Sequence, residues 1–394
     1  MKNLYVHFTR IFLVLIVSFC LSQNEVKASH AMGADLQYTC LGNNQYRITL
    51  RFYRDCKGIA APATVPITLT AAGCAGAATL NVTLQPNTAI NCPPGSNQGC
   101  EVSQLCPSQI NQSACNYTGP GTAPYPGVRV HEYSGIVTLP ANCPNWLIRY
   151  RECCRNNAID NVVNPSGNDM SIEALINNSI NPQTGQPYCN NSVAFASLPV
   201  PFVCVNSNVT YNNGAVDVDG DSLVYSLITP LGNGYNPMTF NAGWNVNNPV
   251  RTNPPSTFQF STNTGQMAFT PAFQEEDVLA VRVSEFRNGV LVGYTMRDIQ
   301  VTVLNCAIAI PSQNPINNVQ NGNQVDSLKV QVCPGTPLQF DILATDPANH
   351  NLTLSSNLNS NPPAIPGASM VQVGTGDSVI ARVTWTPQPS DTGC

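Results

Sequence analysis

The chain has 394 residues, of which only 10% are charged, and its formal net charge is −5. This mild acidity excludes the basic surface that binding to nucleic acid requires. A hydrophobic content of 43% is sufficient for a core, whereas 32 prolines and 27 glycines interrupt the chain too often for long helices. The composition predicts an all-β fold of many short strands joined by turns.

The N-terminus has the pattern of an export signal. Basic residues precede an apolar run over residues 11–21, which is shorter than the roughly 20 residues of a transmembrane helix. Small residues predict cleavage after Ala28, so that residues 1–28 form the signal peptide. An alternative lipoprotein signal would use Cys20, but the bulky Phe19 departs from the usual lipid-attachment pattern. We therefore expect a secreted chain with no membrane-spanning segment in its mature part.

The 16 cysteines predict disulfide bonds in an exported protein. A zinc site is not expected, because the chain has no Cys-x-x-Cys pair and few histidines. The adjacent residues Cys153 and Cys154 should bond to different partners, because a bond between neighbours strains the backbone. The N-terminal region should hold five or six disulfides, with Cys204 free to pair with Cys306 instead. The disulfide candidates are Cys40, Cys56, Cys74, Cys92, Cys100, Cys106, Cys115, Cys143, Cys153, Cys154, Cys189, Cys204, Cys306 and Cys333.

Residues 29–202 are predicted to form a disulfide-rich β domain, because most of the cysteines lie in them. Apolar and polar residues alternate over 45–53 and over 146–151, which predicts two strands. A short helix is expected over residues 171–176.

The second half contains an internal repeat. Residues 215–226 align with residues 344–355 at an offset of 129, and the Phe-Thr-Pro of 269–271 aligns with the Trp-Thr-Pro of 385–387 at an offset of 116. Short strand candidates separated by turn residues predict that each copy is an immunoglobulin-like β-sandwich.

The repeat sets the expected boundaries. The first sandwich covers residues 203–306, a linker covers 307–328, and the second sandwich covers 329–394. By the same alignment, the second copy stops about 28 residues short of the first, without its last two strands. It is expected to be a fragment of a longer product, or to be completed by another strand.

Two sets of motifs resemble known families. The run Ala-x-Asp-x-Asp-Gly-Asp from Ala215, the Phe-Thr-Pro motif and a strand that ends with the run from Arg297 to Val303 resemble a cadherin-like domain of the dystroglycan type. The Tyr-Arg-Asp-Cys motif from Tyr53 and the Arg-Glu-Cys-Cys-Arg-Asn motif from Arg151 resemble surface proteins of gliding Bacteroidetes that use type IX secretion. These resemblances imply immunoglobulin-fold repeats and an adhesin-like role at the cell surface.

The acidic turn of the first repeat is the candidate metal site. Asp217, Asp219 and Asp221 supply the hard oxygen ligands that calcium prefers. The cadherin-like resemblance implies that Asp217 and Asp219 are ligands, with Asp221 as a third. The alternative is a polar turn between strands. The second copy keeps Asp346 but has His350 in place of the last aspartate, so it is expected to bind calcium poorly.

No catalytic residue is predicted, because the usual hydrolase motifs are absent. The acidic run at residues 275–277 is interpreted as a solvated turn. The sequence predicts a secreted cell-surface adhesin or matrix-type protein that binds a surface glycan, polymer or protein, with calcium as its only cofactor. The alternatives are a structural stalk that spaces a C-terminal module from the cell, and a glycan-active enzyme.

Overall fold

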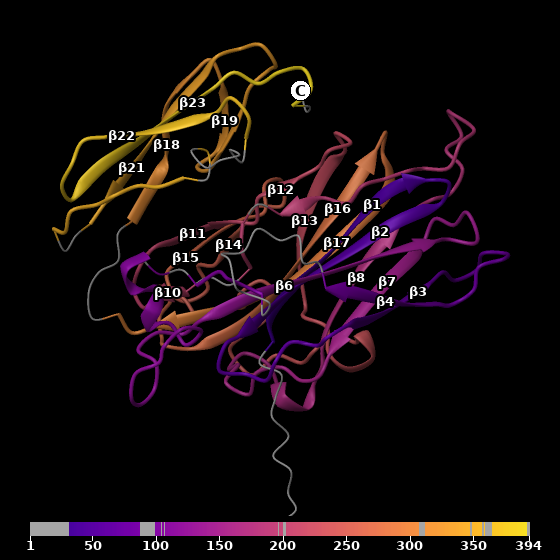
Figure 1. Cartoon of the computed structure of the whole chain (residues 1–394), viewed down its shortest axis with the longest axis horizontal. Coiled ribbons are helices and arrows are strands. Elements are labelled where there is room, and N and C mark those ends of the chain that lie inside the picture. Colours follow the sequence, from indigo (N-terminus) through magenta and orange to yellow (C-terminus); the bar gives the residue numbers. More distant parts are fainter. Residues whose placement is uncertain are drawn as a thin grey trace, which may run out of the picture.

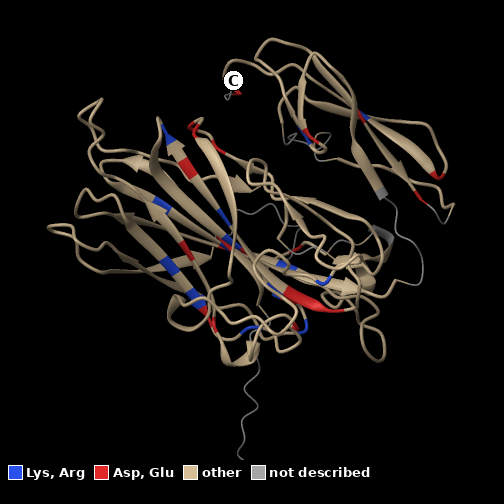
Figure 2. Cartoon of the chain, turned by 180° about the vertical axis from the view of Figure 1, so that it is seen from behind, with Lys and Arg blue, Asp and Glu red and all other residues tan. Residues whose placement is uncertain are grey.

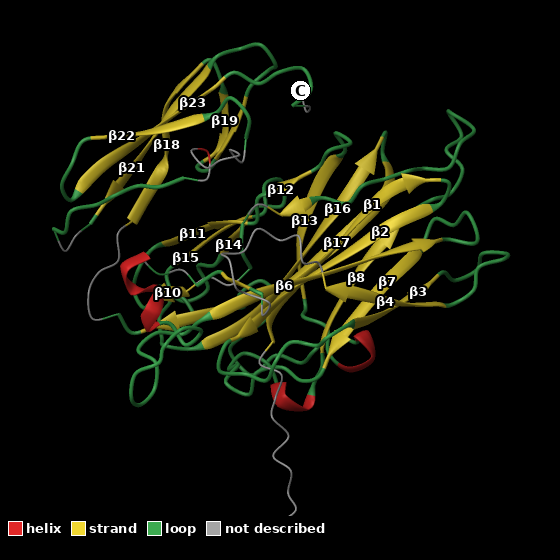
Figure 3. Cartoon of the chain, in the orientation of Figure 1, coloured by secondary structure: helices red, strands yellow, loops and turns green. Residues whose placement is uncertain are grey.

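The computed structural model describes residues 31–86, 99–103, 105, 107–195, 197–199, 202–306, 312–346, 349–356, 358 and 365–391. Strands dominate this part of the chain (Figures 1 and 3), which confirms the predicted all-β fold. Its helices are three short 3-10 turns, η1 (Pro107–Gln112), η2 (Pro165–Gly167) and η3 (Asn233–Tyr235). Within the described ranges, no helix has the length and apolar character needed to cross a membrane. The predicted signal peptide lies outside these ranges.

A 12-stranded sheet forms the body of the molecule (Figure 1), in the order β1-β2-β6-β4-β3-β7-β8-β17-β16-β13, with β5 paired to β6 and β10 paired to β17. Its strands are β1 (Ala31–Gly42), β2 (Gln45–Asp55), β3 (Val65–Thr70), β4 (Leu80–Pro86), β5 (Cys100–Glu101), β6 (Val128–Thr138), β7 (Trp146–Glu152), β8 (Met170–Ile176), β10 (Phe202–Cys204), β13 (Ser222–Ile228), β16 (Glu276–Arg287) and β17 (Val290–Leu304).

Alternation of apolar residues determines which face of the sheet is buried. In β2, Tyr46, Ile48 and Leu50 are buried, whereas the intervening Gln45 and Arg47 are exposed. Successive strand residues point to opposite faces, so one face of β2 packs into the main hydrophobic core. The strands predicted over 45–53 and 146–151 are therefore confirmed as β2 and β7.

The helix expected over residues 171–176 is wrong, because this segment is strand β8. β8 lies between β7 and β17, and Ala174 pairs with Ile148 on one side and Thr295 on the other. Ile172 and Ile176 join the main core. Hydrogen bonding on both sides and burial outweigh the local helix preference of this short segment.

The domain boundary expected near residue 203 falls within one continuous sheet. β1 pairs with β17, where Asp35 lies opposite Arg297, and β8 pairs with the same strand through Leu175 and Tyr294. β10, which begins at Phe202, also pairs with β17. The N-terminal region and the first repeat therefore share strands of a single structural unit.

A smaller sheet completes the first sandwich. It has the order β11-β15-β14. Met267 and Phe269 from this sheet pack with Val281 and Ile299 from β16 and β17 in a second hydrophobic core. This arrangement of two packed sheets confirms the predicted sandwich. The bounds are β11 (Val209–Asn212), β14 (Gln259–Phe260) and β15 (Gln266–Phe269), and a separate pair is formed by β9 (Ala194–Phe195) and β12 (Ala215–Val216).

The C-terminal unit repeats the same strand register. Val209 pairs with Phe269 in the first copy, and Leu338 pairs with Trp385 in the second, at the offsets of 129 and 116 found in the sequence. Its sheet has the order β18-β21-β23-β22, and β19 and β20 form a hairpin. The bounds are β18 (Ser312–Gln320), β19 (Asn323–Asp326), β20 (Lys329–Gln331), β21 (Leu338–Thr345), β22 (Ser369–Val373) and β23 (Ser378–Trp385).

The linker expected over 307–328 is wrong in its second part, because β18 lies there and pairs with β21 along the sheet. The apolar face of this sheet, which includes Phe340, Val383 and Trp385, lines a groove of about 810 Å³. The corresponding face of the first copy packs against β16 and β17.

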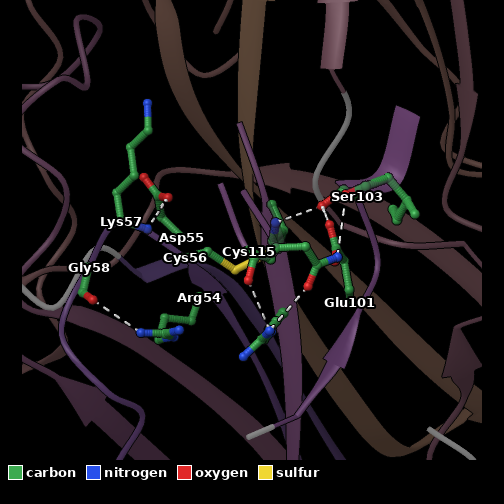
Figure 4. Close-up of a disulfide and its surroundings, with 12 residues drawn as sticks. Arg54, Asp55, Cys56, Lys57, Gly58, Glu101, Ser103 and Cys115 are labelled. Atoms are coloured by element: carbon green, nitrogen blue, oxygen red, sulfur yellow. Dashed lines mark hydrogen bonds between the residues drawn. A yellow bond between two sulfur atoms is a disulfide. The ribbon is translucent and has the colours of Figure 1, made fainter. Parts of the chain in front are cut away.

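Most disulfides among the described residues join segments far apart in the sequence, and one joins two adjacent cysteines. The pairs are Cys40–Cys189, Cys56–Cys115, Cys74–Cys143, Cys153–Cys154 and Cys204–Cys306. Cys100 is also disulfide-bonded, and the candidates Cys92 and Cys106 lie outside the described residues. In Figure 4, Lys57 next to the Cys56–Cys115 bond donates its backbone N–H to Asp55 Oδ1 at 2.9 Å.

Two cysteine predictions need correction. Cys153 and Cys154 bond to each other, with their Cα atoms 3.0 Å apart. Cys333 has a free, exposed thiol.

Candidate functional site

The predicted acidic residues lie on the loop between β12 and β13. Gly220 has φ +77°, a left-handed conformation that favours glycine, so the chain can turn there. Asp217 Oδ1 accepts hydrogen bonds from the backbone N–H groups of Asp219 at 3.0 Å and Asp221 at 2.8 Å. The Asp217 carboxylate therefore organises the loop, as aspartate does in Asx turns.

Arg287, at the end of β16, holds the other two carboxylates. Its Nε and Nη2 donate to the two oxygens of Asp221 at 2.7 and 2.8 Å, and Nη2 also contacts Asp219 Oδ2 at 2.9 Å. The hydrogen bond to Asp221 is the main reason that the pKa of Arg287 is raised. Asn191 donates its side-chain N–H to Asp219 Oδ1 at 2.7 Å. These bonds clamp the loop onto β16.

Beneath the loop lies Glu285, which is fully buried on β16. Its Oε2 accepts from the Tyr38 hydroxyl at 3.4 Å and from Asn190 Nδ2 at 3.2 Å. Burial raises the pKa of Glu285 well above its usual value, and the charge of Asp217 adds to this rise. Among the described residues, Glu285 Oε1 and Asp217 Oδ2 are buried without a hydrogen-bond partner.

The acidic loop fits calcium only in part. Asp217 and Glu285 each offer an unpartnered buried oxygen, of the kind that calcium binds. Asp219 and Asp221 instead face the guanidinium of Arg287. No group of three or more His, Cys, Asp or Glu side chains that could hold a metal ion is found in the described ranges. The calcium site therefore stays a prediction.

The corresponding turn of the second copy has a different arrangement. Asp346 is buried, and its Oδ2 lies 2.8 Å from Nδ1 of His350, which is mostly exposed. His350 therefore takes a partner on the turn itself, while residue 348 lies outside the described residues.

The acidic run at residues 275–277 is not the solvated turn that we expected. Glu275 and Asp277 are both buried, and Glu275 Oε2 contacts Nε of Arg251 at 2.6 Å. The Arg251 guanidinium lies over the rings of Trp244 and Phe273, with its Cζ 4.5 and 4.3 Å from their centroids. Burial is the main cause that raises the pKa of Asp277 to about 10, and the neighbouring carboxyl group of Glu275 adds to the rise. Both oxygens of Asp277 are buried without a hydrogen-bond partner among the described residues. The raised pKa favours the protonated, neutral form of Asp277.

The sequence did not identify Arg287, Glu285 or Asn190 as members of the acidic site. Arg287 lies 66 residues from Asp221, and Asn190 lies 95 residues from Glu285. No local spacing pattern joins residues at such separations. The pairing of β13 with β16, which sets Ser222 opposite Phe286, brings Glu285 and Arg287 to the loop. Asn190 reaches the site from the segment before β9, where it donates to Glu285. Charged residues are sparse along the ribbon (Figure 2).

Comparison with known proteins does not assign a family. No protein-family model and no curated protein matches the sequence. Among solved structures, the chain is similar to the crystal structure of Down Syndrome Cell Adhesion Molecule (DSCAM) isoform 1.30.30, N-terminal eight Ig domains, with 10% sequence identity and a TM-score of 0.17. The match covers 86% of this chain and 35% of that chain, so this chain spans about a third of its length. At such a TM-score the likeness carries no argument, and the immunoglobulin-like architecture rests on the strand pairings themselves.

Proposed function

We propose that the chain is a secreted, non-catalytic binding protein of the cell exterior, of the adhesin or matrix type. The observation that carries this proposal is the set of disulfides between distant segments. Cys40–Cys189 and Cys204–Cys306 close loops of 149 and 102 residues. Such bonds persist outside the cytosol and give an all-β scaffold a fixed shape. A rigid scaffold of this kind presents loops for recognition.

The test is binding without turnover. The oxidised chain is added to immobilised polysaccharides, extracellular-matrix proteins and bacterial cells, and bound protein and released sugar are both measured. Saturable binding with no released reducing sugar supports the proposal. Release of sugar points instead to the glycan-active enzyme, and a lack of saturable binding to every surface favours the structural stalk.

Calcium binding at the acidic loop is a second proposal. The unpartnered oxygens of Asp217 and Glu285 favour it, because a cation between them would satisfy both. Arg287 opposes it by neutralising Asp219 and Asp221. In this proposal calcium would stiffen the loop against β16 without taking part in chemistry.

A further inference from the structure

Arg282 on β16 is a cation without an anionic partner. Its neighbours across the sheet are Ser226 on β13 and Met296 on β17, neither of which carries a charge. In the described part of the chain, no hydrogen bond or ion pair of its guanidinium is found, and its Nε is buried without a partner. A half-buried guanidinium in this state carries an unbalanced positive charge, and its Nε–H is a buried donor without an acceptor.

The guanidinium lines a cavity of about 350 Å³, a volume within the range of small-molecule sites. Strands β8, β13, β16 and β17 and the loop after β13 form its walls. Most of the walls are apolar, with Leu227, Leu231, Val246 and Met296 among the lining residues. A cavity with apolar walls and one free cation combines the two features that orient a small amphiphilic ligand.

Neighbouring side chains hold Arg282 in place. Its Cζ lies 5.3 Å from the ring centroid of Tyr294, in cation–π contact. The Tyr294 hydroxyl donates to Glu173 Oε1 at 2.7 Å, and the other oxygen of Glu173 accepts from Arg149 Nε at 3.1 Å. Glu173 and Arg149 thus neutralise each other, and Arg282 remains as the single unbalanced charge.

We propose that this cavity binds a small monocarboxylate with an apolar body. The planar guanidinium offers paired N–H donors that match the two oxygens of a carboxylate. One negative charge balances Arg282, whereas a dianionic phosphate would leave a second, unbalanced negative charge in a largely apolar cavity. The apolar walls accommodate the rest of the ligand. This site is separate from the acidic loop, and the proposal does not depend on the adhesin function.

The test is isothermal titration of the full oxidised chain with phenylacetate at low ionic strength, with phenylacetamide and phenyl phosphate as matched probes. Phenylacetate should bind at least about tenfold more tightly than either probe, which is the effect of one charge-assisted contact. Arg282→Met keeps the length of the side chain and should lose this preference. Arg47→Met removes the same charge from an exposed position on β2 and should leave binding unchanged.

Arg282→Lys is a second variant, in case Arg282→Met fails to fold. It keeps the positive charge at this position but lacks the planar guanidinium. It should bind phenylacetate more weakly than wild type and more tightly than Arg282→Met. The proposal is overturned if wild type does not bind phenylacetate at millimolar concentration, or if phenylacetamide binds equally well. Tighter binding of phenyl phosphate, or unchanged binding by Arg282→Met, overturns it as well.

Discussion

Arg155 and Asp298 form a bidentate ion pair in the interior, with Nη1–Oδ1 and Nη2–Oδ2 distances of 3.0 and 2.7 Å and each side chain 1% exposed. Arg155 follows β7 in the N-terminal region, and Asp298 lies on β17 of the first repeat. The preceding residue of β17, Arg297, forms an ion pair with Asp35 of β1, with 3.1 Å between Nη2 and Oδ2. Adjacent residues of a strand point to opposite faces, so β17 is tied to the N-terminal region on both faces.

Arg155→Met should destabilise the whole unit of residues 31–306. It leaves Asp298 buried without its counter-charge, which typically costs about 3–5 kcal/mol. Equilibrium unfolding in guanidinium chloride, followed by tryptophan fluorescence and circular dichroism on the oxidised chain, measures the change in the free energy of unfolding.

Arg151→Met is the matched control, because Arg151 is 64% exposed and lies 3.7 Å from Asp169. A surface pair of this kind contributes roughly 0–1 kcal/mol. If Arg155→Met changed stability no more than this control, the ion pair would not be important for joining the two regions. If Arg155→Met instead made the N-terminal region unfold in a separate transition at lower denaturant concentration, with the unfolding of the first repeat unchanged, the result would support a domain boundary near residue 203.

The Cys204–Cys306 bond should contribute strongly to stability. It closes a loop of 102 residues, for which the chain-entropy model gives about 4–5 kcal/mol. The variant Cys204→Ser/Cys306→Ser should lower the melting temperature by many degrees. Cys333→Ser, which removes a free exposed thiol, should leave it unchanged.

Peptide mapping without reduction should recover Cys40–Cys189, Cys56–Cys115 and Cys74–Cys143. Mostly free thiols at these positions would contradict the disulfide scaffold.

Asp277→Asn should alter how stability depends on pH. The pKa of Asp277 is raised from 3.8 to about 10, so between these values the folded state holds a proton that the unfolded state releases. Stability of the wild type therefore falls as pH rises through this range, by at most about 1.4 kcal/mol per pH unit from this group. Asparagine is close to aspartate in size and shape but does not titrate.

The difference in unfolding free energy between Asp277→Asn and wild type should be smallest near pH 4 and should grow in favour of the variant towards pH 8. Other groups, including Glu276 with its pKa raised to about 7 by burial, titrate in both proteins and largely cancel in the difference. Urea unfolding at four pH values measures it. A difference independent of pH would show that Asp277 is ionised in the folded protein.

Calcium should raise the melting temperature of the full chain at millimolar concentration, by mass action on the folded state. Asp217→Asn/Asp219→Asn should abolish this shift. Arg287→Gln should enlarge it, because the variant releases Asp219 and Asp221 from their ion pairs. Magnesium at the same ionic strength controls for screening. No shift in wild type together with a shift in Arg287→Gln would show that Arg287 takes the place of the cation.

The sequence by itself determined the features that repeat at short range. The abundance of proline and glycine indicated short strands, and the alternation of Tyr46, Ile48 and Leu50 identified β2 and its buried face. The offsets of 129 and 116 correctly matched Leu338 and Trp385 to a paired position in the first copy. These inferences succeed because a strand has a period of two residues, and because repeated sequences fold with the same register.

Only the tertiary structure decided which distant segments meet. It pairs β1 with β17 across more than 250 residues, and it makes residues 170–176 a strand because both neighbours hydrogen-bond to it. It also turns the acidic run at 275–277 inward, where Arg251 can pair with Glu275. Strand pairing and ion pairing depend on distance in space, and the energy of a contact is the same however many residues separate its partners. Such contacts therefore leave no local pattern in the sequence, and the candidate site was visible only as three aspartates on a turn.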